Sequence, residues 1–348
     1  MRLEQRERIP AGYRVLAPVL ALVASLVICA GALWWAGASP LEAYWRILVG
    51  SFGSMFALTE TLTRATVLTF TGLAVAMAFR ARLWNIGAEG QFYGGALLTV
   101  VLGTGLLPLP WYLLIPVLFV AGAAAGALIL LGPALLKVRW NVDEVVTTLL
   151  LNFIILLIIE ALLQGPLKDP LGIWPQSAPV VEQARLSILL DGHRLHSGLI
   201  IALVLVAVVW VFNNLTIWGY ELRAVGQNRE AATFAGLPVA RGMVRVALIS
   251  GAIAGLAGVI QVLGVKGNLT LDISSGFGYT GIVVAMLAQL RALGIFPAAV
   301  FVSAVFIGSG AMSRDLNVPS YIADVITAVA LLMMLVGLLL VQYRVRLR

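Results

Sequence analysis

The stretch YLLIPVLFVAGAAAGALILLGPALL, residues 112–136, contains no charged side chain in its 25 residues. An α-helix needs about 20 predominantly apolar residues to cross a lipid bilayer. A strand of a membrane β-barrel would instead show about ten residues of alternating polarity. The stretch therefore predicts a membrane-spanning helix.

The whole chain has the same character. It has 348 residues, of which 61% are hydrophobic and 11% are charged, whereas soluble domains carry about 25% charged residues. A soluble domain has too much surface to hide so many apolar side chains. High hydrophobicity excludes a disordered chain, and the single cysteine, Cys29, excludes a disulfide-based scaffold. We predict an all-α polytopic membrane protein.

Apolar runs of helix length recur along the chain and predict about ten transmembrane helices. The sixth and eighth runs are short, so they leave open whether these helices cross the whole membrane. The predicted spans are residues 15–36, 58–79, 86–106, 112–136, 144–163, 197–212, 243–264, 278–290, 294–311 and 321–341.

The basic residues predict the orientation. With both termini in the cytoplasm, 16 of the 23 Lys and Arg residues fall on the cytoplasmic face, six fall outside and Arg64 lies within a span. We expect a cytoplasmic arm over residues 1–14, a single transmembrane domain over 15–341 and a cytoplasmic tail over 342–348. The longest outer loop is 164–196, and the longest inner loop is 214–242. The net charge of +7 then reports topology and indicates no binding of nucleic acid.

Sequence patterns typical of catalysis are missing. The chain has no G-x-x-x-x-G-K-[ST] and no H-E-x-x-H pattern, so it carries neither a P-loop for ATP nor that zinc site. Its two histidines, His193 and His196, are three residues apart in the outer loop, where we expect surface residues rather than metal ligands. We predict no catalytic residue, no metal and no cofactor bound by this chain.

A polar motif, NIGAEGQ (residues 85–91), opens the third predicted span. Polar groups in a membrane need partners, and glycine allows close approach of backbones. In one interpretation Asn85 caps the helix and Glu89 interacts with its dipole. In the other, the motif is an irregular helix start that faces a pathway. On the second interpretation the candidate pathway residues are Asn85, Glu89, Gln91, Asn152 and Gln261.

Two further starts of helices are predicted from their capping residues. Asn141 followed by Glu144 resembles a capping box at the start of the fifth span. In the inner loop, Asn228 is a suitable N-cap, Gly236 a suitable C-terminal stop and Pro238 a helix breaker. The helix between them is too short to be stable alone in water, so we expect it to dock onto another surface.

At these motifs the sequence resembles a known family. The residues on which the resemblance rests are 85–91, 143–153, Gly165-Pro166-Leu167 and 226–236. The resemblance extends from about residue 58 to residue 341. It is to permease subunits of bacterial ABC importers that serve branched-chain amino acids, simple sugars and nucleosides, and it is strongest to nucleoside permeases. Asp143 stands where that branch leads us to expect Asn.

The resemblance implies a fold, a location and partners. The fold would be that of the vitamin B12-type (type II) importers, in the cytoplasmic (inner) membrane. The partners would be ABC ATPase subunits that bind ATP and Mg, a second permease subunit (identical or homologous), an extracytoplasmic binding protein and membrane lipid. The short inner helix would be the coupling helix that contacts the ATPase. Its residues are Asn228, Arg229, Glu230, Ala231, Ala232, Phe234 and Gly236.

Other functions stay open at this point. Within the importer class, a simple sugar such as ribose or a branched-chain amino acid is an alternative substrate. Outside that class, a secondary transporter driven by an ion gradient would also have acids within its spans. A membrane scaffold without transport is the third alternative.

Overall fold

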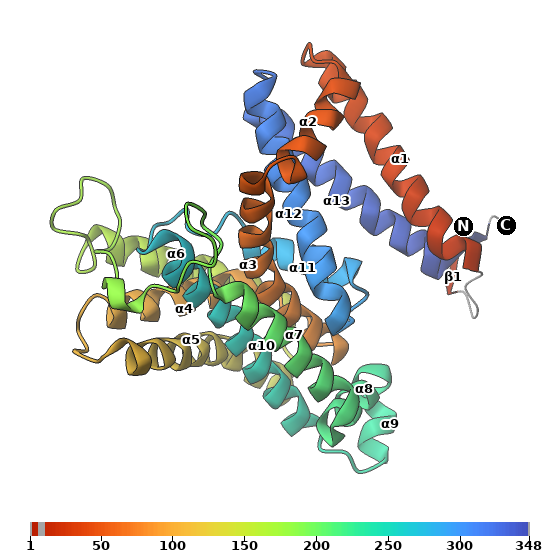
Figure 1. Cartoon of the computed structure of the whole chain (residues 1–348). Helices are drawn as coiled ribbons and strands as arrows, with labels where there is room; N and C mark the ends of the chain where they lie inside the picture. Colours follow the sequence, from red (N-terminus) through yellow and green to blue (C-terminus); the bar gives the residue numbers. More distant parts are fainter. Residues whose placement is uncertain (1, 6–10, 347–348) are drawn as a thin grey trace. The chain divides into compact units, whose positions relative to one another are not determined.

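Helices make up about three quarters of the computed structural model, which describes residues 2–5 and 11–346 (Figure 1). The chain divides into two compact units. Unit 1 contains the residues up to Thr61 together with those from Val300 onward, and unit 2 contains Leu62–Ala299. Two helices, α3 (Met55–Arg80) and α12 (Ala292–Asp315), contribute residues to both units.

Unit 1 brings the two ends of the described chain together. Its short strands pair antiparallel, with Arg2 opposite Arg346. Its buried cluster includes Cys29, Leu33 and Met312. Besides its parts of α3 and α12, the unit contains β1 (Arg2–Gln5), α1 (Ala11–Trp35), α2 (Pro40–Phe52), α13 (Ser320–Gln342) and β2 (Tyr343–Arg346).

Helix α2 is absent from the sequence prediction. It begins with Pro40, a residue favoured in the first helical turn, and follows α1 after a bend of 111°. With 13 residues, including Glu42 and Arg46, it is too short and too charged to read as a separate span.

Unit 2 contains the segments with the predicted functional motifs. Figure 1 shows α8 and α9 together at one end of α10. The helices are α4 (Ala88–Gly103), α5 (Trp111–Trp140), α6 (Glu144–Gln164), a 3-10 turn (Glu182–Ala184), α7 (Gly198–Leu215), α8 (Ile217–Gln227), α9 (Arg229–Phe234), α10 (Val239–Gln261), a π-helical turn (Val262–Lys266) and α11 (Phe277–Leu287).

Glycines bring α4, α5 and α10 into backbone contact. A Cβ atom on Gly126 of α5 would lie 2.1 Å from the carbonyl oxygen of Gly251 of α10. A Cβ on Gly255 would lie 2.2 Å from the oxygen of Gly122, and one on Gly95 would lie 2.1 Å from that of Gly255. In lipid, where helices gain little from burying apolar side chains against each other, such small-residue contacts are a main source of attraction. They fix these three helices as the centre of unit 2.

All ten predicted spans coincide with helices, but the structure does not establish ten crossings. Within the described residues, seven helices are long and apolar enough to cross a membrane, or eight if the bent pair of α1 and α2 is one span. Helices α4 and α11 have only 16 and 11 residues.

The predicted capping box at Asn141 is wrong. Helix α5 continues to Trp140, and Asn141 ends it in a left-handed conformation (φ 54°), which asparagine tolerates well. Asp143 is the N-cap of α6 instead, and its Oδ1 accepts from the amide of Val145 at 2.8 Å. Glu144 is buried and pairs with Nζ of Lys137 at 2.8 Å.

The histidine pair is only partly at the surface. His196 is 1% exposed, contrary to the prediction of a surface residue, because its ring packs against Gly198 and Gly264. Its Nδ1 accepts from the amide of Gly198 at 3.1 Å. Burial, with a smaller effect from the charge of Arg185, lowers the pKa of His196 to about 4. The described residues include no cluster of three or more His, Cys, Asp or Glu residues suited to a metal ion.

Candidate translocation and coupling sites

Asn85 lies in the non-helical link between α3 and α4 and is fully buried. Its Nδ2 donates to Oε1 of Gln91 at 3.0 Å and to Oγ of Ser250 at 3.1 Å. Its Oδ1 accepts from Nε2 of Gln91 and from the amide of Gly87, both at 2.9 Å. Asn85 is therefore not the N-cap of α4, because Gly87 holds that position. It joins the link to α4 and α10.

Asn152, in the middle of α6, holds the same link from another side. Its Oδ1 accepts from the amide of Gly90 at 2.8 Å, and its Nδ2 donates to the carbonyl of Ile86 at 2.9 Å. A third contact joins Nδ2 to the hydroxyl of Tyr279 at 3.1 Å. The sequence required a partner for Asn152, and the structure supplies three.

Glu89 and Gln261 face the segment that precedes and begins α11. Oε2 of Glu89 accepts from the amide of Gly278 at 2.6 Å. Gly278 has to be glycine here, since a Cβ would lie 2.2 Å from the backbone nitrogen of Glu89. Nε2 of Gln261 donates to the carbonyl of Ile273 at 3.3 Å.

The five candidate pathway residues thus form two neighbouring groups. The structure joins Asn85 and Gln91 directly, places Asn152 on the same backbone link, and brings Glu89 and Gln261 to the segment around α11. All five are at most 6% exposed. Non-helical backbone at membrane depth persists only where protein or water satisfies its polar groups. Asn85, Gln91 and Asn152 hold the irregular start of α4 in place. Glu89 and Gln261 hold the segment that precedes and begins α11.

The short helix of the inner loop has the opposite environment. Helix α9 begins after Asn228, whose Oδ1 accepts from the amide of Ala231 at 3.0 Å, and Gly236 follows it with φ 78°. Both predicted caps are confirmed. Ala232 is buried against the protein, whereas Phe234 is 97% exposed. The remaining predicted coupling residues, Asn228, Arg229, Glu230, Ala231 and Gly236, are exposed.

Helix α8, which directly precedes α9, is an element that the sequence analysis missed. Thr216 caps it by accepting from the amide of Gly219 at 3.1 Å. Trp218, Leu222 and Val225 follow at helical spacing, a signal that could have located it. All three line a largely apolar cavity of ≈ 220 Å³ beside α10.

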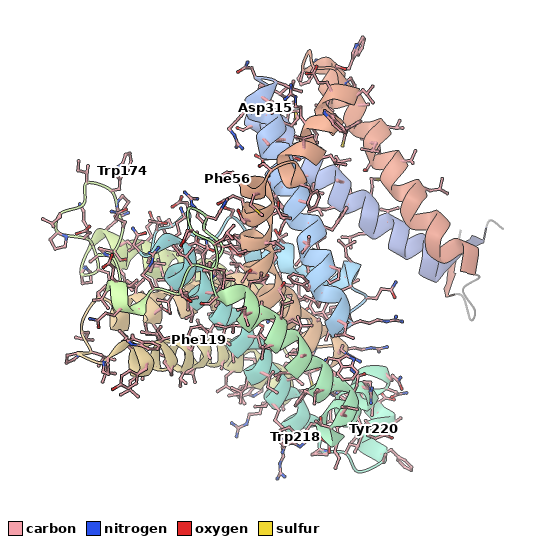
Figure 2. The ribbon with its side chains drawn as sticks, in the orientation of Figure 1. Phe56, Phe119, Trp174, Trp218, Tyr220 and Asp315 are labelled. Atoms are coloured by element: carbon pink, nitrogen blue, oxygen red, sulfur yellow. The ribbon has the colours of Figure 1, made fainter. Side chains whose placement is uncertain are left out.

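Three exposed aromatic residues lie at the two ends of unit 2. Figure 2 shows Trp218 and Tyr220 at the α8 end and Trp174 at the tip of the long loop between α6 and α7. That loop tip is apolar and open, with Leu171 95%, Ile173 91% and Trp174 75% exposed.

Comparison with known proteins identifies the family. The family model described as "Branched-chain amino acid transport system / permease component" matches residues 57–341. The chain is 36% identical over 331 residues to the guanosine ABC transporter permease protein NupP of Bacillus subtilis, covering 91% of this chain and 92% of that one. It is 33% identical over 355 residues to the glucose ABC transporter permease protein TsgB13 of Haloferax volcanii, covering 99% and 93%.

A third relative is the nucleoside ABC transporter permease protein NupB of Lactococcus lactis, 29% identical over 90% of this chain and 89% of that one. These matches run nearly end to end, and the family model includes α4, α6, α9 and α11. The chain therefore belongs to the branched-chain amino acid transport system permease family and is a multi-pass permease subunit of an ABC transporter.

Proposed function

We propose that this permease imports nucleosides, together with a separate ATPase and an extracytoplasmic binding protein. The observation that carries the proposal is the match to the guanosine permease at 36% identity over nine-tenths of both chains. The nucleoside permease of Lactococcus lactis adds support. A sugar is the second candidate substrate, because the glucose permease is 33% identical over 99% of this chain.

The ATPase would contact α9. This helix is held on the protein through Ala232 and presents Phe234 to the outside, as a docking helix for another subunit requires. ATP binding and hydrolysis on the partner, with Mg, would move α9 and open the pathway alternately to each side. This chain would contribute a path and no covalent chemistry.

The binding protein would dock on the opposite side, on the loop between α6 and α7 with its exposed apolar tip. We place both ends of the chain in the cytoplasm and the protein in the cytoplasmic membrane. The pairing of β1 with β2 supports a common side for the two ends. An even number of crossings follows, which favours eight or ten spans over seven. A second permease subunit, identical or homologous, would complete the pathway.

The roles of the pathway residues are a further part of the proposal. Asn85, Gln91 and Asn152 would shape the pathway by fixing the start of α4, while Glu89 and Gln261 would fix the neighbouring segment of α11. Replacing Glu89 or Asn152 by alanine should then reduce transport in complexes that still assemble. Unchanged uptake by both variants would limit these residues to a role in stability.

Uptake into proteoliposomes tests the proposed substrate. The vesicles would contain the permease, its ATPase and its binding protein, and would receive labelled guanosine or adenosine with or without ATP at the ATPase. Excess ribose, glucose or leucine would be the competitors. We expect nucleoside uptake that requires ATP and is not inhibited by any of the three competitors. ATP-dependent uptake of a sugar or of leucine would show that the nucleoside assignment is wrong, while the assignment as an ABC importer would stand. Uptake driven by an ion gradient without ATP would overturn the importer mechanism.

A further inference from the structure

Three polar side chains of α6 form a row that contacts the start of α4. Glu144, Thr148 and Asn152 are four residues apart and therefore lie on one face of the helix. Oε1 of Glu144 accepts from the amide of Trp84 at 3.4 Å, and Oγ1 of Thr148 accepts from the amide of Ile86 at 3.3 Å. Asn152 contributes the contacts to Ile86 and Gly90 described above. We call these three side chains the α6 ladder.

The ladder satisfies backbone groups that have no helical partner. The link over residues 81–87 is not helical, and Arg82 within it has a positive φ of 53°. The amides of Trp84 and Ile86 lie in this link, and the amide of Gly90 belongs to the first turn of α4, where helices leave their donors unpaired. The ladder thus holds the link and the start of α4 against α6.

The start of the same link, next to α3, contacts α8. A Cβ on Gly226, near the end of α8, would lie 1.9 Å from the carbonyl oxygen of Arg80, the last residue of α3, and 3.5 Å from the Cα of Ala81, the first residue of the link. The two backbones therefore touch, and α8 cannot move toward the link without displacing it.

A polar pocket lies between the link and α9. It has a volume of ≈ 510 Å³, and its lining includes Arg82, Trp84, Glu144 and Arg229. Arg229 is the first residue of α9, and Glu144 is the first member of the ladder. The pocket gives the link and α9 room to approach each other.

At its other end the ladder reaches α11. Asn152 contacts the hydroxyl of Tyr279, and Glu89 in the first turn of α4 accepts from the amide of Gly278. Hydrogen bonds through α6 therefore connect the link to the starts of both α4 and α11.

We propose that the α6 ladder transmits the displacement of α8 and α9 to α4 and α11, with Thr148 as its central positioning residue. The inference rests on the proposed function, because it needs an ATPase that moves α9. The ladder contacts no substrate in this mechanism. It keeps the link and α4 moving together when the cytoplasmic helices shift.

Two fluorescent labels test the proposal without any transported substrate. In a Cys29→Ala background, a bimane is attached to a cysteine at Arg82, in the link, or at Thr104, which is exposed at the far end of α4. The permease–ATPase complex in nanodiscs then receives Mg-ATP. We expect ATP to change the emission of both labels in the otherwise unaltered protein.

Thr148→Val should leave the response at position 82 intact and reduce that at position 104 by about fivefold or more, the range of coupling between distant sites. Thr148→Ser, which retains the acceptor oxygen, should restore the response. Thr147→Val is the matched control, because the Thr147 hydroxyl donates only within its own helical turn, to the carbonyls of Asp143 and Glu144. If Thr148→Val does not assemble with the ATPase, Thr148→Ala serves in its place.

Three results would overturn the proposed role of the α6 ladder. They are an unchanged response of the label at position 104 in Thr148→Val, the same loss of that response in Thr148→Ser, or no response of the label at position 82 in the unaltered protein. A failure of nucleoside uptake in proteoliposomes would affect none of these signals, so it would remove the proposed substrate alone.

Discussion

The NIGAEGQ motif and helix α9 are both short polar segments beside predicted spans, but their side chains have opposite environments. Asn85 is fully buried and makes four hydrogen bonds within the protein. Phe234 in α9 is 97% exposed. The comparison distinguishes two kinds of short segment: the first uses its polar groups to fix the protein's own backbone, and the second leaves most of its side chains exposed.

The largest effect on stability is expected at the backbone contact between α5 and α10, in the interior around the first segment. Gly126→Ala places a methyl group against the backbone of α10, which a side-chain rotation cannot relieve. We expect a loss of about 4 kcal/mol of stability, at the upper end for single substitutions. The thermal midpoint of the purified permease measures it. Gly132→Ala in the same helix, where nothing lies within 4 Å, should change stability by less than about 1 kcal/mol. Equal effects of the two variants would show that α5 and α10 are not in backbone contact.

The next effect compares one asparagine from each segment. Asn85→Leu removes four hydrogen bonds and leaves buried polar groups of Gln91, Gly87 and Ser250 without the partner that Asn85 supplied. We therefore expect the stability of the protein to fall by about 3 kcal/mol. Asn228→Ala removes one exposed cap and should cost about 1 kcal/mol. Denaturation of both variants in the same detergent gives the two values. A larger loss for Asn228→Ala would invert the comparison.

His196 provides a buried polar group with fewer partners than Asn85. Its Nε2 has no hydrogen-bond partner among the described residues. Because the pKa of the folded state is about 4, below the usual value of 6.5, the unfolded chain binds more protons between these values. Stability should therefore fall as the pH decreases through this window, by about 2 kcal/mol between about pH 7 and pH 5.

Thermal midpoints as a function of pH, for the unaltered protein and His196→Gln, measure this contribution. The variant should have the shallower dependence between the two pH values. Parallel curves would mean that the pKa of His196 is the same in the folded and the unfolded protein.

The smallest effect on stability is expected at Phe234. Phe234→Ala removes an exposed side chain and should change stability by less than about 0.5 kcal/mol. In the reconstituted complex it should reduce the amount of substrate imported per ATP hydrolysed, because it removes the main apolar contact that α9 offers. Thr233→Ala, on the same helix, is the control. Normal import per ATP in Phe234→Ala would assign the docking surface to other residues.

Hydropathy and capping residues were sufficient to predict the positions of most helices. Long apolar runs located all ten helices that were expected, and Asn228 with Gly236 located α9, because these signals are local in sequence. Helix α2 was missed because its 13 residues carry charges and depend on packing within unit 1.

Contacts between distant residues were beyond such signals. Glu144 and Thr148 bind amides 60 and 62 residues away, and nothing in either local sequence specifies that register. The burial of His196 likewise depends on Gly264, far along the chain. The N-cap of α6 was predicted at Asn141 instead of Asp143 because asparagine suits both an N-cap and a left-handed helix end, and the end of α5 decides between them.

The length of α5 relates the permease to the lipid around it. Its 30 residues extend about 45 Å, whereas the hydrocarbon layer of a bilayer is about 30 Å thick. Trp111 and Trp140, at its two ends, are 62% and 66% exposed, and tryptophan favours the level of the lipid headgroups. Tilting is one way in which a helix of this length can match the hydrocarbon thickness. Since α4 and α10 touch its backbone, they have to tilt with it, so the acyl-chain length of the surrounding lipid should set the resting geometry of all three.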